Sequence, residues 1–217
     1  MESLLQEIRQ RYEIVWERIR LGELEFDFWR IANPECLLDD ETLLKSYADL
    51  PWQPYWAETW DTAHGVALEL AERDLQSKRV LDLGCGLGLT GTVAAACGAT
   101  VVMGDYAPPA LPFACVNSWP WRERVEVIHL NWREDNLHEE FDLIVGSDIL
   151  YDRDDLPYLD SFWRSHLARE GSVLLGDPSR LMTREFIQWI RQRGWRMTER
   201  RRDVPQSNRP IRLIELS

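Results

Sequence analysis

From residue 79 onward the chain alternates short apolar runs with amphipathic segments, and this alternation limits the folds available to it. Helical patterns at residues 90–97, 107–118 and 154–167 separate most of the apolar runs. The runs have the length and composition of buried strands, and they are RVLDL (79–83), TVVMGD (100–105), RVEVIHL (124–130), FDLIVGSD (141–148) and GSVLLGD (171–177). Strands alternating with helices predict an α/β fold with a mostly parallel sheet covered on both faces.

The end of the chain departs from this regular alternation. We expect a helix at 184–194, a sixth strand at 195–203 and a seventh at 210–217, with no helix between the last two. Because parallel neighbours need a long crossover connection, at least one of these strands is expected to be antiparallel. The predicted architecture is a Rossmann-like, doubly wound, seven-stranded sheet with an antiparallel C-terminal strand.

The first 50 residues follow a different pattern, and we expect them to form an N-terminal extension packed on a domain of residues 51–217. The extension is predicted to begin with an amphipathic helix that ends near Gly22. Its apolar face would carry Leu5, Ile8, Tyr12, Val15 and Ile19. The segment ELEFDFWRI (23–31) alternates apolar and polar residues, as a strand does.

A stretch rich in proline and tryptophan, LPWQPYWAETW (50–60), follows the extension. Its prolines exclude a regular helix at its beginning, so we predict a shaped loop that leads into a helix from about Asp61 to Leu75. Three of the 11 tryptophans of the chain, Trp52, Trp56 and Trp60, fall in this loop. Such clustering suggests an aromatic wall beside a binding site.

The formal net charge is −12, which argues against nucleic-acid binding because phosphate affinity needs a basic face. Residues 1–160 carry 13 basic and 31 acidic side chains, a net charge of −18, whereas residues 161–217 carry 12 basic and 6 acidic ones, a net charge of +6. A cationic partner is therefore expected to be attracted to the first part of the chain.

Composition also bears on location and on metals. No apolar run approaches the ~20 residues of a membrane span, and no signal peptide is visible, so we expect a soluble protein without a membrane partner. The scattered cysteines, Cys36, Cys85, Cys97 and Cys115, suggest reduced thiols and a cytoplasmic location. Neither they nor the four histidines show zinc-ligand spacing, so no metal is expected.

Polar residues and glycines follow four of the predicted strands, at the sheet edge where ligands of such folds bind. They are Gly84, Cys85, Gly86 and Gly88 after the first strand, Asp105 at the end of the second, Asn131 and Trp132 after the third, and Asp148 after the fourth. Glycines allow a ligand to approach the backbone closely, and an acidic residue 17 positions beyond Gly88 can accept two ribose hydroxyls.

Dinucleotides and S-adenosylmethionine both use this arrangement. The spacing GxGxG, in place of GxGxxG, displaces the glycine that packs close to a pyrophosphate. Asp82, two positions before the first glycine, suits an amino group better than a phosphate. The final strand pair lies where a dinucleotide domain usually continues with another crossover. These three observations favour S-adenosylmethionine.

The motifs LDLGCGLGLTG, GDY and SDILY resemble those of the seven-strand, class I S-adenosylmethionine-dependent methyltransferases. The chain is more closely similar to methyltransferase family 16, which contains protein lysine methyltransferases. Within it, PYWAETWDTA, NW, SDILY and GDPSR resemble the branch that modifies the β subunit of the electron-transfer flavoprotein. The likeness covers about residues 50–190. It departs at Ser179, where that branch has glycine in GDPGR.

The resemblance implies roles for individual residues. Asp82 would hold the amino group of the cofactor, directly or through water, Asp105 the ribose hydroxyls, and Trp132 would lie against the adenine. Trp60 would close over the cofactor, and packing is the alternative role of both Trp60 and Trp132. The implied cofactor site comprises Trp60, Asp82, Gly84, Cys85, Gly86, Gly88, Asp105, Tyr106, Asn131, Trp132 and Ser147.

Methyl transfer to a lysine also requires an acceptor site. Asp148 and Tyr151 in SDILY are the expected catalytic residues, which would orient the amine, with helix capping and aromatic packing as their alternative roles. Glu58 is a weaker candidate. The competing hypotheses are a small-molecule or other protein acceptor on the same fold, a non-catalytic binding module, and a nicotinamide-dependent oxidoreductase.

Overall fold

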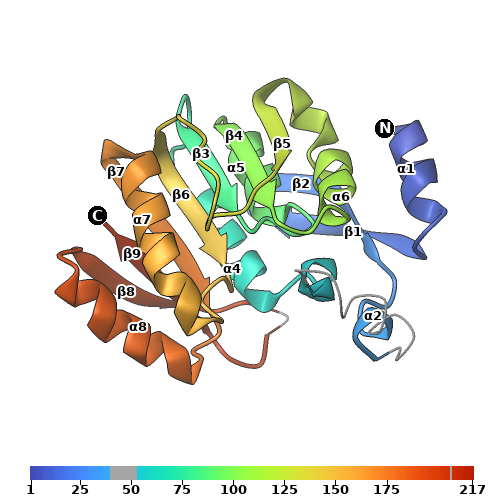
Figure 1. The fold of residues 1–217 in the computed structure, drawn as a ribbon. Helices are drawn as coiled ribbons and strands as arrows, with labels where there is room; N and C mark the ends of the chain where they lie inside the picture. The colour runs from blue at the N-terminus through green and yellow to red at the C-terminus, as the bar shows by residue number, and fades with distance from the viewer. Residues whose placement is uncertain (40–52, 206) are drawn as a thin grey trace.

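The structure is a computed structural model that describes residues 1–39, 53–205 and 207–217 (Figure 1). Its main sheet has seven strands in the order β5-β4-β3-β6-β7-β9-β8. The strands are β3 (Arg79–Leu83), β4 (Thr100–Asp105), β5 (Val125–His129), β6 (Phe141–Ser147), β7 (Leu167–Asp177), β8 (Met197–Arg202) and β9 (Ile211–Leu216). β9 is antiparallel to both of its neighbours, whereas the remaining pairs are parallel. The predicted fold class is confirmed.

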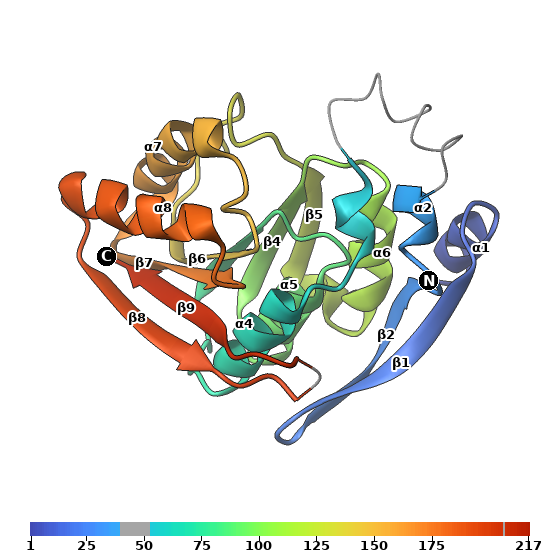
Figure 2. The ribbon, with the colours of Figure 1, turned by 90° about the horizontal axis from the view of Figure 1, so that it is seen from below.

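Helices cover both faces of this sheet, as the alternating pattern predicts (Figures 1 and 2). The helices α4 (Asp61–Ala71), α5 (Leu89–Ala96) and α6 (Ala110–Asn117) enclose one apolar core with it, and α7 (Leu156–His166) and α8 (Leu181–Gln192) enclose another. Successive residues of β3 show the alternation, since Val80 lies in the first core and Leu81 in the second. Shorter helices are α2 (Cys36–Asp39), η1 (Pro54–Ala57), η2 (Trp119–Arg124) and η3 (Arg153–Asp155).

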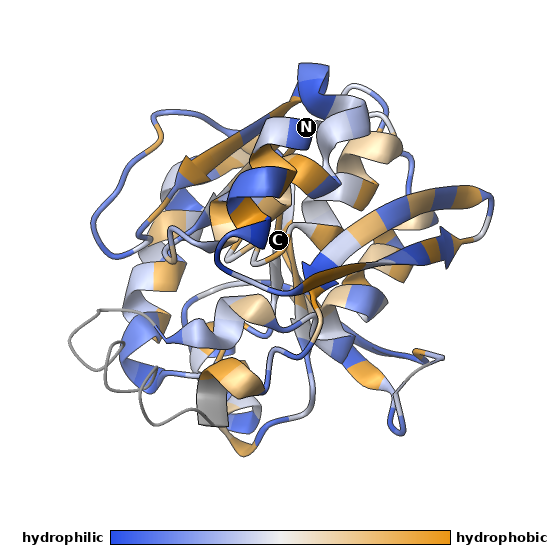
Figure 3. Cartoon of the chain, turned by 90° about the vertical axis from the view of Figure 1, so that its right-hand side faces the viewer, coloured by the Kyte–Doolittle hydropathy of each residue, from blue (hydrophilic) through white to orange (hydrophobic). Residues whose placement is uncertain are grey.

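The long N-terminal helix expected to end near Gly22 is wrong. The helix α1 spans only Glu2–Arg9, and β1 (Ile14–Leu21) then pairs with β2 (Leu24–Ile31) in an antiparallel hairpin. Gly22 has φ of +62° in the two-residue turn. Glycine adopts this left-handed conformation in hairpin turns as well as at helix ends. Ile19 and Leu21 are buried while Arg18 and Arg20 are exposed, which is the two-residue period of a strand. Figure 3 shows this alternation of hydropathy along the hairpin.

The hairpin is attached to the main domain through a side-chain amide. Asn117, at the end of α6, accepts a hydrogen bond from the backbone N–H of Trp29 at 2.6 Å and donates to the carbonyl of the same residue at 3.0 Å. It also donates to the carbonyl of Leu87 at 2.8 Å. One buried amide therefore joins β2 to the glycine-rich loop after β3. The expected boundary near residue 50 lies outside the described residues.

Other boundaries differ by a few residues from those expected. α4 ends at Ala71 rather than near Leu75, and α6 begins at Ala110, after the two prolines at 108 and 109. No helix among the described residues is long and apolar enough to cross a membrane. The strand order places the carboxyl ends of β3 and β6 side by side, where the chain turns from one half of the sheet to the other.

Candidate active site

A cavity of about 580 Å³ opens at the carboxyl ends of β3, β4 and β6. Its size is typical of a site for a small molecule. Ten of the thirteen residues expected from the sequence line it, namely Trp60, Gly84, Cys85, Gly86, Asp105, Tyr106, Trp132, Ser147, Asp148 and Tyr151. Asp82, Gly88 and Asn131 do not line it. The topology therefore brings most of the expected residues together at the predicted sheet edge.

The glycine-rich loop forms the floor of the cavity. Gly84, Gly86 and Gly88 have φ of +71°, +51° and +85°, which L side chains rarely adopt. A Cβ on Gly86 would lie 3.2 Å from the carbonyl oxygen of Trp56, so this glycine allows the Trp-rich loop to cross closely. A Cβ on Gly88 would lie 2.9 Å from Cα of Ala114 in α6. Gly88 thus serves helix packing rather than the cavity wall.

Asp105 fixes the loop from the end of β4. Its Oδ2 accepts a hydrogen bond from the N–H of Gly86 at 2.7 Å, and its Oδ1 accepts one from the N–H of Ala107 at 2.8 Å. Burial raises the pKa of this carboxyl, while the two backbone donors counteract the shift. Each oxygen keeps a further lone pair, so the carboxylate can still accept hydroxyl donors from a ligand in the cavity.

Asp82 lies behind the loop. Its Oδ2 accepts hydrogen bonds from Oγ1 of Thr90 at 2.6 Å and from the N–H of Gly91 at 2.7 Å. Its Oδ1 is buried and has no hydrogen-bond partner among the described residues. Burial raises the pKa of Asp82 to about 6. Thr90 lines the cavity and separates the carboxylate of Asp82 from it. A cationic group of a ligand in the cavity would therefore compensate the charge of this carboxylate.

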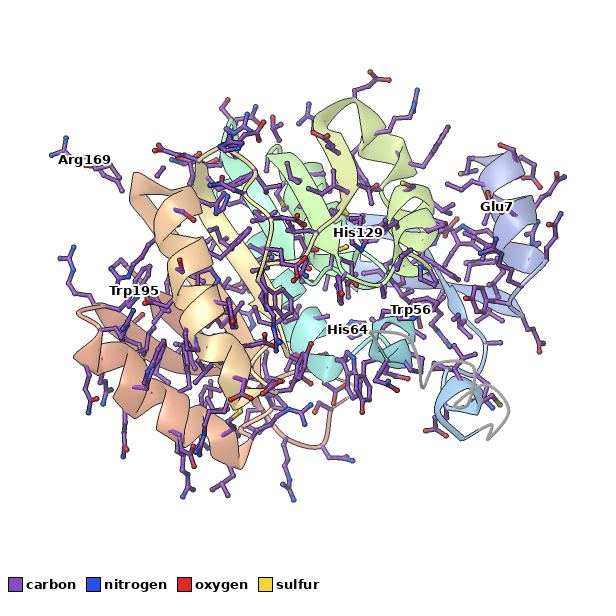
Figure 4. The ribbon with its side chains drawn as sticks, viewed as in Figure 1. Glu7, Trp56, His64, His129, Arg169 and Trp195 are labelled. Atoms are coloured by element: carbon purple, nitrogen blue, oxygen red, sulfur yellow. The ribbon has the colours of Figure 1, made fainter. Side chains whose placement is uncertain are left out.

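Aromatic residues line a second part of the cavity wall. Trp132 contributes its ring, and its Nε1 donates to Oδ1 of Asp155 at 3.1 Å. Trp60 donates from Nε1 to the carbonyl of Tyr55 at 3.1 Å. Trp56, labelled in Figure 4, is buried, and the centroid of its ring lies 5.7 Å from that of Tyr12, which follows α1. The expected aromatic wall thus includes Trp56 and Trp60, whereas Trp52 lies outside the described residues.

Asn131 has a local structural role. Its N–H donates to Oδ2 of Asp135 at 2.7 Å, and its Oδ1 accepts from the N–H of Arg133 at 3.0 Å. These bonds shape the turn that presents Trp132. Tyr106 lines the cavity, and its carbonyl lies 3.1 Å from Nε2 of His129, a residue labelled in Figure 4.

The two expected catalytic residues lie on the segment after β6, and both line the cavity. Tyr151 is 54% exposed. Partial burial, together with the nearby carboxylates of Asp155 and Asp105, raises its pKa to about 12, so it is a neutral phenol at physiological pH. Asp148 is paired with Arg180, whose Nε and Nη2 donate to Oδ1 and Oδ2 at 2.8 and 2.7 Å. Sequence reasoning did not assign a role to Arg180. Its signal was the GDPSR motif, in which it is the last residue.

Glu58 also lines the cavity, and burial raises the pKa of its carboxyl, with the neighbouring Glu35 adding to the shift. Among the described residues no group of three or more His, Cys, Asp and Glu side chains is arranged to hold a metal ion. The cavity therefore presents acceptors for a ligand with hydroxyl and cationic groups, beside an aromatic wall.

Comparisons with known proteins agree with this geometry. A family model described as lysine methyltransferase matches residues 53–193. The protein N-lysine methyltransferase METTL21A of Danio rerio is 36% identical over 148 residues, which cover 63% of this chain and 67% of that protein. The electron transfer flavoprotein beta subunit lysine methyltransferase of Xenopus laevis is 31% identical over 173 residues, which cover 75% of this chain and 63% of that protein. The chain thus spans about two thirds of the length of these relatives.

Solved structures share the fold at low sequence identity. The glycopeptide N-methyltransferase MtfA matches with a TM-score of 0.62 and 17% identity, over 71% of this chain and 95% of that chain. Fibrillarin of Aeropyrum pernix, solved with natively bound S-adenosyl-L-methionine, matches with a TM-score of 0.57 and 16% identity, over 72% of this chain and 76% of that one.

Proposed function

Because this chain belongs to the lysine methyltransferase family, we propose that it methylates a lysine side chain of a protein. Membership makes the chain an S-adenosylmethionine-dependent methyltransferase, and the acceptor is the proposed part. Two kinds of relative, METTL21A and the electron transfer flavoprotein beta subunit enzyme, are named for lysine. The branch indicated by the sequence motifs is therefore among the relatives.

The observation that carries the proposal is the carboxylate of Asp148 at the cavity, beside the neutral phenol of Tyr151. The side chain of Asp148 is 6% exposed and faces the same cavity as the glycine loop. A carboxylate can accept an N–H of an incoming amine, and a tyrosine ring can contact the alkyl chain or a cation. The net charge of −18 on residues 1–160 also supports a cationic acceptor.

The residues fit the cofactor on three features of the site. The amino group would compensate the charge of Asp82 behind Thr90, and Asp105 would hold the ribose hydroxyls. The loop at Gly84 and Gly86, whose positive φ values favour glycine, lines the cavity where the cofactor would lie. Trp132 would lie against the adenine, with Trp60, Tyr106 and Ser147 completing the wall. Gly88 and Asn131 would act from behind, by fixing helix packing and the turn before Trp132.

When bound, S-adenosylmethionine supplies a methyl group on a sulfonium, which a neutral amine can attack. The tasks left to the protein are alignment of the amine and exclusion of water. Asp148 would orient the nitrogen, and the aromatic residues would limit access of solvent. A lysine with an ordinary pKa of about 10.4 is protonated at neutral pH, so the site must also favour loss of that proton.

The test is incubation of the purified enzyme with methyl-labelled S-adenosylmethionine and an extract of its source cells, followed by hydrolysis of labelled protein to amino acids. We expect label in methylated lysine. Label in methylated arginine would favour the acceptor type of a histone-arginine methyltransferase, METTL23 of Xenopus laevis, which is 32% identical over 145 residues. Label in small molecules alone would refute a protein acceptor. A thermal shift with S-adenosylhomocysteine but not with NAD or NADP tests the cofactor site separately.

The cytoplasmic location and the absence of nucleic-acid and metal partners remain predictions from composition and residue spacing. A methylated protein identified in the assay would indicate the compartment through its own location.

A further inference from the structure

Asp148 and Arg180 form a bidentate ion pair at the mouth of the cavity. The two N–H···O distances are 2.8 and 2.7 Å, and both residues line the cavity. The side chain of Asp148 is 6% exposed, whereas that of Arg180 is 43% exposed. The guanidinium therefore covers the carboxylate from the solvent side.

The backbone on both sides of the pair adopts conformations that non-glycine residues rarely take. Asp148 has φ of +58° and Ser179, next to Arg180, has φ of +69°. These are two of the four non-glycine residues with positive φ in the described ranges. Each costs on the order of 1 kcal/mol and persists because surrounding bonds hold it. Here the N–H of Asp148 donates to the carbonyl of Gly176 at 2.9 Å, and the N–H of Ser179 donates to Oδ2 of Asp177 at 2.7 Å.

We propose that Arg180 is a positioning residue that balances the charge of Asp148, so that the carboxylate orients the acceptor lysine without stabilising its protonated form. This proposal rests on the proposed lysine acceptor. An unpaired carboxylate in a cavity attracts an ammonium and holds it protonated, which makes the nitrogen unreactive. A carboxylate already paired with a guanidinium still has lone pairs to accept an N–H from a neutral amine.

The lysine ammonium releases one proton to water, and the nitrogen lone pair then forms the new N–C bond to the methyl carbon. The C–S bond breaks with its electron pair left on sulfur, which becomes a neutral thioether. Arg180 stays protonated throughout, because its pairing with Asp148 raises a pKa that is already high. The role of Arg180 is therefore electrostatic and not that of a base.

Other charged groups near the pair are already compensated. Asp177 accepts hydrogen bonds from Thr183 and Ser179 and lies near Arg212, and burial raises its pKa. Asp152 and Asp155, on the side of Tyr151, are paired with Arg133 at 3.4 and 2.5 Å. The remaining titratable groups that line the cavity are Tyr55, Glu58, Cys85, Asp105, Tyr106 and Tyr151. Within the described part of the protein, Arg180 is the cation bonded to Asp148.

The test compares the full-length enzyme with Arg180→Gln, Arg180→Lys and the control Arg184→Gln, an exposed arginine in α8. Initial rates of label transfer are measured from pH 6.5 to 9.5 at extract concentrations at which the rate no longer rises with added acceptor, because the limb then reports the bound lysine. We expect Arg180→Gln to move the rising limb about one pH unit upward, which is about a tenfold lower rate at pH 7. The rates of variant and wild type should converge at high pH.

Arg180→Lys should restore the position of the limb, and Arg184→Gln should not move it. Calorimetry with S-adenosylhomocysteine should give the same affinity for all four proteins, which verifies that the cofactor site is intact. A rate that falls by one factor at every pH would overturn the proposal, because a merely structural role predicts that result. A wild-type enzyme that labels no lysine would instead refute the proposed function, on which this inference depends.

Discussion

Replacement of Asp105 by asparagine tests how the glycine loop and the cofactor site are coupled. The carboxylate of Asp105 accepts one backbone N–H on each oxygen, from Gly86 at 2.7 Å and from Ala107 at 2.8 Å. Asparagine has one acceptor oxygen, so its amide group would face one of these N–H donors. A buried donor without a partner costs about 1 to 3 kcal/mol, and a lost hydrogen bond to a charged acceptor about 1.5 to 3 kcal/mol.

The same carboxylate is proposed to accept the two ribose hydroxyls, so the substitution also weakens charged hydrogen bonds to the ligand, each worth about 1.5 to 3 kcal/mol. We therefore expect Asp105→Asn to weaken binding of S-adenosylhomocysteine by about 3 kcal/mol, which is roughly 150-fold. Isothermal titration calorimetry measures this directly. Asp148→Asn is the matched control, because Asp148 follows another strand and bonds to Arg180 rather than to the loop. It should keep the cofactor affinity within about threefold and lose methyl transfer. Equal losses of affinity in the two variants, or none in Asp105→Asn, would refute this division of roles.

Three further predictions concern the charges and the backbone around the site. Burial raises the pKa of Asp82 to about 6, so between about pH 4 and 6 the folded apoprotein holds a proton that the unfolded chain has released. Stability therefore falls as pH rises, by roughly 3 kcal/mol over the whole titration and by about 2 kcal/mol between pH 4.5 and 6.5. Urea unfolding at pH 4.5 and 6.5 should show this decrease, and Asp82→Asn should lack it; parallel changes in both proteins would contradict the assignment. Gly88→Ala should destabilise by about 3 kcal/mol through its φ of +85° and the close approach to Ala114, whereas Gly194→Ala, with the same φ and nothing within 4 Å, should cost about 1 kcal/mol. Equal melting temperatures would show that packing at Gly88 is not tight. Ser179→Gly should leave stability equal or up to about 1 kcal/mol higher and keep activity, because its φ of +69° suits glycine, while Ser179→Val should lower stability; the reverse order in thermal unfolding would disprove this reading.

The sheet and the position of the cavity were predictable because both depend on local patterns. Apolar runs followed by glycine or aspartate identify strand ends, and parallel topology brings those ends to one edge, where Gly84, Asp105 and Asp148 meet. The hairpin β1–β2 was not predicted, because Tyr12, Val15 and Ile19 fit a helical spacing. The turn at Gly22 joins the two strands of this hairpin, but a glycine at this position also fits the end of a helix.

The depth of a residue relative to the cavity also could not be predicted. The position of a strand end determines which edge of the sheet a residue occupies, but not whether a neighbouring side chain covers that residue. Asp82 lies behind Thr90, and the side chain of Asn131 bonds within the turn that presents Trp132. The pairing of Asp148 with Arg180 joins residues 32 positions apart. The backbone is left-handed at Asp148 and at Ser179, next to Arg180, although neither residue is glycine, and a single sequence does not reveal this.

Unsatisfied polar atoms connect stability with ligand binding in this fold. Within the described residues, seven buried side-chain atoms lack a hydrogen-bond partner. Three of them, on Trp56, Thr59 and Ser147, belong to residues of the cavity wall, and a fourth is Oδ1 of Asp82 behind it. Each such group costs on the order of 1 to 3 kcal/mol when no partner is present. The two apolar cores must compensate for these groups in the apoprotein, because each of these atoms is inaccessible to solvent. A cationic methyl donor in the cavity would lower the electrostatic cost of the buried Asp82 carboxylate behind Thr90, and it would thereby stabilise the same edge of the sheet that it needs for reaction.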